Sequence, residues 1–226
     1  MKPSLSVLVF LKLGGSLITD KNERETIRSD VLARVAREIK GALLANPNLT
    51  LVLGHGAGSF GHVAAAHHST RDGVAGEKAW KGFCDVSLGQ QELNRCVLSQ
   101  HVPCLLRLTA SSYRSRPSAS ASCRDGGIVS LATASLLSAL RAGLVPVVCG
   151  DVAFDEVRGG TIVSTEEVFS YLAGALKPDF LLLAGETDGV IPLITRDNLD
   201  EIAAALGGSG GIDVTGGMAS KVPRSL

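Results

Sequence analysis

The chain has 226 residues, of which 45% are apolar and 19% are charged, and its formal net charge is zero. This length suits one sizeable α/β core or two closely packed lobes. A net charge of zero gives no indication of nucleic acid or an anionic membrane as a general partner. No apolar run approaches the roughly 18 residues that a bilayer-spanning helix needs. The five cysteines are widely spaced and lack a C-x-x-C pair, which argues against a disulfide framework or a zinc site and favours a reducing compartment, the cytoplasm.

The first predicted elements alternate between strand and helix. An apolar strand is predicted over 5–13, followed by a polar loop over 19–28. From Ser29, whose hydroxyl is suited to cap a helix, apolar residues recur at helical spacing as far as Asn46. A second strand follows at 49–54. This alternation is typical of a mostly parallel sheet with helices on both faces.

The alternation continues through the rest of the chain. The further predicted elements are a helix near 87–100, an apolar segment at 102–108, a helix near 130–142, a strand at 144–149, a helix from the capping box at Ser164 through Leu176, a strand at 180–184 and a helix near 197–206. The segment 109–124 carries six serines and no periodicity. It is interpreted either as a mobile lid or as a passive surface loop.

Two glycine-rich loops follow the first two strands. The first is Lys12-Leu13-Gly14-Gly15-Ser16, and the second runs from Gly54 to His62 as Gly-His-Gly-Ala-Gly-Ser-Phe-Gly-His. Glycines let the backbone turn sharply and bring its N–H groups close to anionic oxygens, although either loop alone is also typical of an ordinary strand-to-helix turn. An unpaired Lys12 ammonium would be costly to bury in an apolar strand end, which favours a phosphate partner. Together the loops predict one phosphate-binding cleft.

These loops belong to an ordered set of motifs that resembles the amino acid kinase superfamily. The set continues with Gly150-Asp151-Val152, the segment 160–164 and the segment from Asp213 to Lys221, so the resemblance covers about residues 5–222. The Ser-Phe-Gly-His ending of the second loop is similar to the isopentenyl phosphate kinase and fosfomycin kinase branch. Within it, the set looks most like the isopentenyl phosphate kinases.

The resemblance implies an α/β fold, a three-layer αβα sandwich with an open, mainly parallel sheet. It implies a single domain over 1–226, with a phosphate-acceptor lobe at about 1–150 and an incomplete nucleotide lobe at about 151–226. The family continues beyond the lysine that Lys221 matches, so a C-terminally truncated member is expected. Where relatives carry a Thr-Asp pair, this chain has the segment 185–190, Gly-Glu-Thr-Asp-Gly-Val.

The implied reaction is transfer of the ATP γ-phosphoryl group to isopentenyl phosphate, with ATP and Mg²⁺ as cofactors and a homodimer as the assembly. The chemistry agrees with the residues. A phosphate monoester has a second pKa of about 6, so its oxygen is already ionised and needs no carboxylate base. The remaining obstacle is repulsion between two anions, which positioning and nearby cations reduce.

The resemblance also implies residue roles. Lys12, Lys21 and His62 are expected to be catalytic. The expected ATP-binding residues are Lys12, Leu13, Gly14, Gly15, Ser16, Ala57, Gly216, Gly217 and Lys221. The expected acceptor-binding residues are Gly56, Gly61, His62 and Gly150, and no residue is assigned as a metal ligand.

Two features of the sequence have more than one interpretation, and the function has rivals. Asp151 is suited either to orient Lys12 or Lys21 or to cap a turn. The stripe of Trp80, Phe83 and Val86 fits a prenyl pocket or an ordinary core-facing helix. The rival functions are a kinase for another small phosphate or phosphonate, such as fosfomycin, and an inactive truncated subunit that binds or dimerises.

Overall fold

A five-stranded parallel sheet forms the centre of the protein, whose computed structural model describes residues 7–20, 22–60, 70–98 and 112–186. The strand order is β11-β1-β4-β8-β5. The strands are β1 (Val7–Leu13), β4 (Leu49–His55), β5 (Ser112–Ser115), β8 (Val145–Cys149) and β11 (Phe180–Ala184). The strands expected near 5–13, 49–54, 144–149 and 180–184 are confirmed. The expected segments 102–108 and 197–206 lie outside the described residues.

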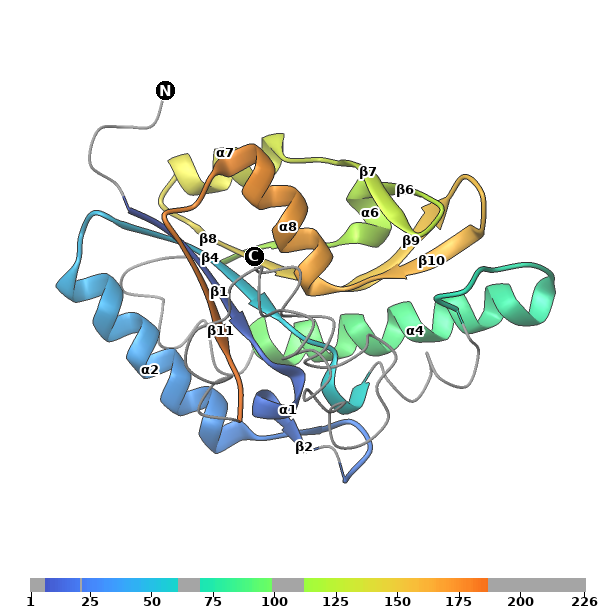
Figure 1. Cartoon of the computed structure of the whole chain (residues 1–226). Coiled ribbons are helices and arrows are strands. Elements are labelled where there is room, and N and C mark those ends of the chain that lie inside the picture. Colours follow the sequence, from blue (N-terminus) through green and yellow to red (C-terminus); the bar gives the residue numbers. More distant parts are fainter. Residues whose placement is uncertain (1–6, 21, 61–69, 99–111, 187–226) are drawn as a thin grey trace, which may run out of the picture.

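Helices cover both faces of this sheet, which confirms the three-layer αβα arrangement (Figure 1). One face carries α2 (Ser29–Ala45) and α4 (Glu77–Cys96), and the other carries α7 (Ala134–Arg141) and α8 (Thr165–Leu176). Each helix buries an apolar stripe against the sheet, because such a stripe is stable only when it is removed from water.

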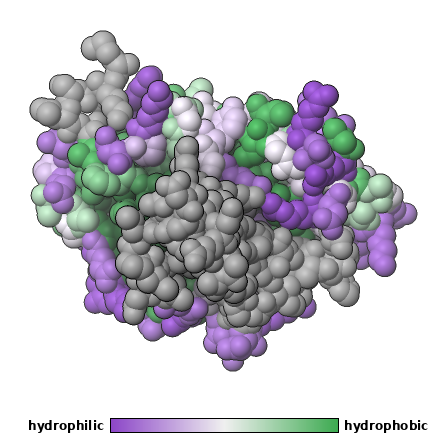
Figure 2. Space-filling view, viewed as in Figure 1, coloured by the Kyte–Doolittle hydropathy of each residue, from purple (hydrophilic) through white to green (hydrophobic). Residues whose placement is uncertain are grey.

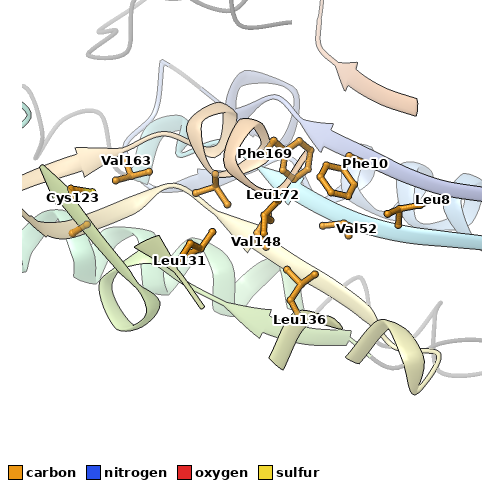
Figure 3. Close-up of a cluster of buried hydrophobic side chains, with 12 residues drawn as sticks. Leu8, Phe10, Val52, Cys123, Leu131, Leu136, Val148, Val163, Phe169 and Leu172 are labelled. Atoms are coloured by element: carbon orange, nitrogen blue, oxygen red, sulfur yellow. The ribbon is translucent and has the colours of Figure 1, made fainter. Parts of the chain in front are cut away.

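The alternation of side chains along the strands decides which helix each residue meets. On β4, Leu51 and Leu53 pack in the core under α2 and α4, whereas Val52 packs in the core under α8. On β1, Leu8 and Phe10 also face α8, where the Phe10 and Phe169 rings lie 5.1 Å apart (Figure 3). Side chains two positions apart along a strand point to the same face of the sheet, so the next such residue on each strand should face the same helices.

A second sheet of four strands packs beside the first, in the order β10-β9-β6-β7. It consists of β6 (Ala121–Arg124), β7 (Gly127–Leu131), β9 (Asp151–Asp155) and β10 (Gly159–Val163). The interpretation of 109–124 as an aperiodic loop is wrong for its described part, which forms β5, the short helix α6 (Pro117–Ser120) and β6. Serine has little intrinsic strand preference, so these strands depend on pairing with β8, β7 and β9.

Several other boundaries differ from expectation. The polar loop at 19–28 contains a strand pair, β2 (Thr19–Asp20) and β3 (Thr26–Ile27), after the short helix α1 (Gly15–Ile18). The Ser29 cap is wrong, since Arg28 precedes α2 and no side chain caps it. The helix expected from 87 starts at Glu77, and the helix expected from 130 starts at Ala134 because β7 occupies 127–131.

The N-terminus of α8 follows the predicted capping box. The Glu167 N–H donates to the Ser164 hydroxyl over 3.2 Å, and the Ser164 N–H donates to the Glu167 carboxylate over 2.6 Å. After α8 the chain enters β11, whose apolar side chains reach the surface of the molecule (Figure 2); Phe180 is 58% exposed. Within the described ranges, no helix has both the length and the apolarity to cross a membrane.

Candidate active site

Because the central strands are parallel, their carboxyl ends lie at the same edge of the sheet, where the two glycine loops meet. A Cβ atom added to Gly15 would lie 2.3 Å from the Gly58 nitrogen, and one added to Gly56 would lie 2.7 Å from the Gly15 nitrogen. Only glycines permit backbones to approach this closely. The expected juxtaposition of the two loops is therefore confirmed, in the form of direct backbone packing.

Thr19 joins the two loops, a role that the sequence did not indicate. Its side chain is buried, and its Oγ1 donates to the Gly15 carbonyl over 2.8 Å. The same atom accepts a hydrogen bond from the Ser59 N–H over 3.0 Å. Thr19 belongs to a stretch that was expected to be a polar loop, and its type alone carries no signal for this contact.

Backbone donors in both loops are left available for a ligand. The Gly14 N–H is used by the Ala184 carbonyl and the Gly56 N–H by the Leu13 carbonyl, over 2.7 and 2.9 Å. The N–H groups of Gly15, Ser16, Ala57 and Gly58, in contrast, donate no hydrogen bond to any residue in the described part of the chain. Adjacent unpaired N–H groups form a site for anionic oxygens.

Lys12 lies at this edge and is only 5% exposed. Its side chain lies on the same side of the sheet as those of Leu8 and Phe10 and points toward α8. There its Nζ lies 3.0 Å from a carboxylate oxygen of Glu166. Burial of an ammonium requires such compensation. The lysine therefore has a protein partner on α8, in addition to its expected phosphate partner.

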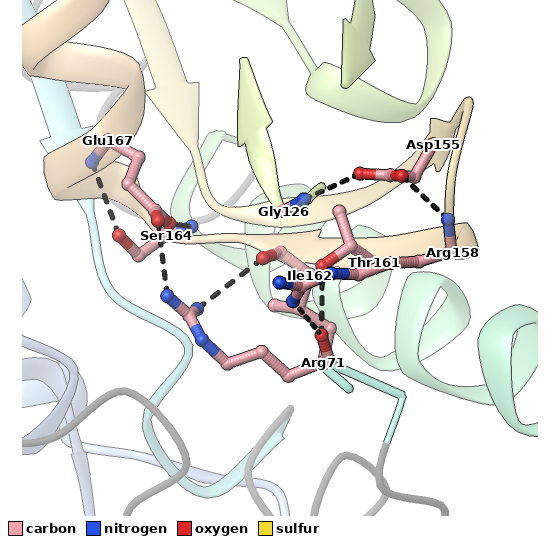
Figure 4. Close-up of polar contacts among 8 residues, drawn as sticks. All are labelled: Arg71, Gly126, Asp155, Arg158, Thr161, Ile162, Ser164 and Glu167. Atoms are coloured by element: carbon pink, nitrogen blue, oxygen red, sulfur yellow. Dashed lines mark hydrogen bonds and ion pairs between the residues drawn. The ribbon is translucent and has the colours of Figure 1, made fainter. Parts of the chain in front are cut away.

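Glu167, which follows Glu166 on α8, forms an ion pair with Arg71, which lies after the second glycine loop in the sequence (Figure 4). The Glu167 carboxylate lies 3.1 Å from the Arg71 guanidinium, which also donates to the Ile162 carbonyl over 3.4 Å. The Arg71 carbonyl accepts a hydrogen bond from the Thr161 hydroxyl over 3.1 Å. Ser59 is thus attached to Thr19, and Arg71 is attached to Glu167 and to the Ile162 carbonyl.

The turn after β9 is stabilised by one buried carboxylate. Asp155 accepts hydrogen bonds from the N–H groups of Gly126 and Arg158 over 2.7 and 2.8 Å (Figure 4). Arg158 in turn donates to Asp125 and to the Arg71 carbonyl. The second sheet and the Arg71 segment are therefore parts of one hydrogen-bonded assembly.

His55 is fully buried where β4 ends, on the α4 side of the sheet. Its Nδ1 lies 3.1 Å from the Gly56 carbonyl and its Nε2 lies 2.8 Å from Nδ2 of Asn94 on α4. Burial, with a smaller effect of the Lys12 charge, lowers the pKa of His55 to about 4, while the bond to Gly56 acts to raise it. The imidazole is neutral at pH 7.

Thr165, the first residue of α8, connects two of the strand ends. Its hydroxyl donates to the His55 carbonyl over 2.6 Å and accepts from the Gly150 N–H over 2.8 Å. A Cβ on Gly150 would lie 2.7 Å from the Val163 carbonyl. The Gly150 N–H is already bonded to Thr165 and is not available to an acceptor molecule. Gly150 would contact an acceptor only through the space that the absence of a side chain leaves.

Two of the open alternatives can be compared with the structure. Asp151 is buried, accepts hydrogen bonds from the Ser118 hydroxyl and the Val152 N–H, and has a pKa raised by burial. Phe83 and Val86 pack in a core cluster with Val152 and its neighbours, as an ordinary core-facing stripe does. Trp80 is 36% exposed, and its ring lies 5.3 Å from that of Phe83 in an edge-on arrangement and 5.9 Å from that of Phe154 in a tilted one.

Six of the expected site residues lie outside the described residues. They are Lys21, Gly61, His62, Gly216, Gly217 and Lys221. The described part brings together Lys12 through Ser16, Gly56, Ala57 and Gly150 at one edge. Thr19, Asn94, Thr165 and Glu166, which support them, were not predicted.

Replacement of Gly58 by alanine tests the packing of the loops. Gly58 has φ +52°, and an added Cβ would lie 2.0 Å from the Thr19 Oγ1 and 2.8 Å from the Gly15 carbonyl. We expect Gly58→Ala to lower the free energy of unfolding by about 2 kcal/mol or more. Urea unfolding measures this change. Gly174→Ala is the matched control, because open space surrounds Gly174 on α8; it should stabilise by about 0.5–1 kcal/mol. Equal effects of the two changes would contradict the packing.

The lowered pKa of His55 predicts a pH dependence of stability. Between the ordinary pKa of 6.5 and the folded value of about 4, the unfolded chain binds a proton at His55 and the folded protein does not. Acidification through this range should therefore cost on the order of 3 kcal/mol of unfolding free energy. Urea unfolding at pH 7 and at pH 4.5 should show this loss in the wild type and a smaller one in His55→Asn. Parallel losses in both proteins would contradict a buried neutral histidine.

The parallel sheet with two glycine loops and a buried lysine at its carboxyl edge defines the class of a small-molecule kinase. The sequence model of the Amino acid kinase family matches residues 8–226, and the chain belongs to this family. The proteins to which it is similar include several isopentenyl phosphate kinases.

The chain is 35% identical to the isopentenyl phosphate kinase of Methanocaldococcus jannaschii over 96% of this chain and 85% of that protein. It is 37% identical to the isopentenyl phosphate kinase of Haloferax volcanii, over 97% and 87% of the two chains. A solved isopentenyl phosphate kinase structure superimposes with a TM-score of 0.72 and 30% identity, over 83% of this chain and 76% of that one. These similarities confirm the amino acid kinase fold and the family resemblance.

Proposed function

We propose that the protein phosphorylates isopentenyl phosphate with ATP, giving isopentenyl diphosphate and ADP. The observation that carries the proposal is the direct packing of two glycine loops beside the buried Lys12, with four loop N–H groups that donate to no described residue. The isopentenyl phosphate kinases to which the chain is similar support this choice of acceptor.

The reaction needs positioning and charge compensation rather than a strong base. The acceptor phosphate is already ionised near neutral pH, so its oxygen attacks the γ-phosphorus in line while the bond to the ADP oxygen breaks. Lys12 and Lys21 offset the charge on the transferring group, and loop N–H groups hold its oxygens. His62 donates a hydrogen bond to the acceptor phosphate.

The residue roles follow the two loops. ATP is assigned to Lys12, Leu13, Gly14, Gly15, Ser16 and Ala57, with Gly216, Gly217 and Lys221 on the nucleotide side. The acceptor is assigned to Gly56, Gly61, His62 and Gly150. The division into an acceptor lobe and a nucleotide lobe near residue 150 remains a prediction, and β11 from the second part pairs with β1 of the first.

Mg²⁺ is proposed to enter as the complex with ATP. Mg²⁺ in such sites keeps several waters and is bound largely by substrate phosphates. Among the described residues, no group of three His, Cys, Asp or Glu side chains is arranged to hold a metal ion. We further propose a cytoplasmic homodimer, which sedimentation of the purified protein would test.

ADP release coupled to NADH oxidation tests the function directly. Isopentenyl phosphate should be turned over far faster than fosfomycin, glutamate or UMP, and dimethylallyl phosphate is included as a second prenyl phosphate. If fosfomycin were turned over faster, the proposed acceptor would have to be changed from a prenyl phosphate to a phosphonate. Preference for an acceptor without phosphate or phosphonate would overturn the role of the second loop, and binding of ATP without turnover of any acceptor would favour an inactive subunit.

A further inference from the structure

His55 is a buried titratable residue to which the proposed reaction gives no task. It lies at the start of the second glycine loop and is 0% exposed, as is its partner Asn94 on α4. Both ring nitrogens of His55 have partners, so the orientation of the ring and the position of its proton can be derived from those partners.

The partners define one tautomer. A backbone carbonyl only accepts hydrogen bonds, so the 3.1 Å contact with Gly56 requires a proton on Nδ1 of His55. The Asn94 amide nitrogen only donates, so the 2.8 Å contact requires Nε2 to be unprotonated. Rotation of the Asn94 amide by half a turn would instead place its oxygen against Nε2, which a neutral Nδ1–H ring cannot satisfy. The lowered pKa of His55 agrees with this neutral form.

Asn94 keeps this orientation although it leaves its own oxygen unsatisfied. Its Oδ1 is buried and has no hydrogen-bond partner among the described residues. A buried carbonyl without a partner costs about 1–3 kcal/mol. A leucine of similar volume would avoid that cost, but it would leave the buried Nε2 of His55 without its donor, so the asparagine is explained by its hydrogen bond to the ring.

The consequence lies in the peptide that joins Gly56 and Ala57. The described chain has no cis peptide bond, and in a planar trans peptide the C=O and the N–H point in opposite directions. The Nδ1–H of His55 holds the Gly56 carbonyl toward the interior, so the Ala57 N–H points away from the interior. That N–H has no partner among the described residues and lies beside the Gly15 loop.

We propose that Asn94 and His55 form a relay that fixes the Gly56–Ala57 peptide with its N–H directed at the transferring phosphoryl group. Asn94 selects the Nδ1–H tautomer, His55 holds the Gly56 carbonyl, and the Ala57 N–H becomes a fixed donor. The Nε2–H tautomer would set a ring lone pair against the Gly56 carbonyl and favour the flipped peptide, whose N–H faces inward. His55 is thus a positioning residue, and the proposal rests on the proposed kinase function.

Two measurements test the relay. Long-range ¹H–¹⁵N correlation spectra of histidine-labelled protein at pH 7, with His55→Asn used for assignment, should show His55 protonated at Nδ1 alone. In Asn94→Leu the ring should shift partly or wholly to the Nε2–H tautomer. In steady-state assays, Asn94→Leu should lower kcat about 10-fold or more, because a misdirected oxyanion donor removes transition-state stabilisation, with both KM values changed less than about three-fold.

Gln90→Met is the matched control. Gln90 is also a buried amide on α4 with an oxygen that lacks a partner in the described part of the chain, but it makes no hydrogen bond to the described residues of either loop. Its replacement should leave kcat and the His55 tautomer unchanged. The relay is overturned by an Nε2–H ring in the wild type, by unchanged kcat in Asn94→Leu, or by equal losses in Gln90→Met.

The same data separate the relay from the proposed function. If the wild type prefers another acceptor, the choice of isopentenyl phosphate fails, and the kinetic comparison is made with the preferred acceptor. If no acceptor is turned over, the kinase function fails, and the tautomer of His55 in wild type and in Asn94→Leu decides the relay.

Discussion

Replacement of Lys12 by methionine should lower kcat about 1,000-fold, because it removes a buried positive charge from the site where two phosphate anions meet in the proposed reaction. Lys12 is 5% exposed and pairs with Glu166 at 3.0 Å. Its loss would leave the Glu166 carboxylate beside the phosphates, so repulsion would add to the missing attraction. Steady-state rates of ADP release measure the effect. Lys81→Met, which removes an exposed charge from α4, should change kcat little.

The salt bridge gives a way to separate catalysis from folding. Breaking a buried ion pair by removing one partner costs about 3–5 kcal/mol, whereas replacing both partners is often close to neutral. The double variant Lys12→Met with Glu166→Gln should therefore recover most of the thermal stability that Lys12→Met loses. Its kcat should stay low. Recovery of turnover together with stability would show that Lys12 serves mainly to satisfy Glu166.

Replacement of His62 by alanine should lower kcat/KM for isopentenyl phosphate by about 100- to 1,000-fold while the KM for ATP stays within about two-fold. The expectation rests on the Ser-Phe-Gly-His motif, since His62 lies outside the described residues. Described residues on either side of the segment 61–69 include Phe60 and Arg71. Phe60 is buried, and Arg71 is attached to the first turn of α8.

A substrate-specific loss is the critical feature of the His62 result. His62→Gln, which keeps a donor, should retain more activity than His62→Ala. His68→Ala serves as the control, because the family motifs give His68 no role. Equal increases in the KM for ATP and for the acceptor would mean that His62 supports the whole loop rather than the acceptor phosphate.

The sequence predicted the parallel strands and the glycine loops well because both signals are local. An apolar run such as 49–54 and the glycines that follow it depend only on neighbouring residues. The helix capping box at Ser164 was also predicted correctly, since its two partners lie three residues apart. The strands β5 and β6 were missed because their serines acquire strand geometry only by pairing with other strands.

The supporting residues of the site were missed for a similar reason. Thr165 meets His55 across 110 positions of the chain, and Asn94 meets His55 across 39. Neither a threonine at a helix start nor an asparagine within a helix is unusual, so no local pattern marks these contacts. The sequence assigns no role to His55 for the same reason.

The sequence by itself determined the α/β class, the strands near 5–13, 49–54, 144–149 and 180–184, and the two glycine loops from which a phosphate-binding cleft is predicted. The tertiary structure alone decided that Lys12 faces Glu166, that His55 faces Asn94, and that Gly15 and Gly58 touch. The period of two along a strand decides which residues share a face, but the order of strands in the sheet decides which helix covers that face. Strand order is a property of the whole chain, so these partners became visible only when β1, β4 and β8 were side by side.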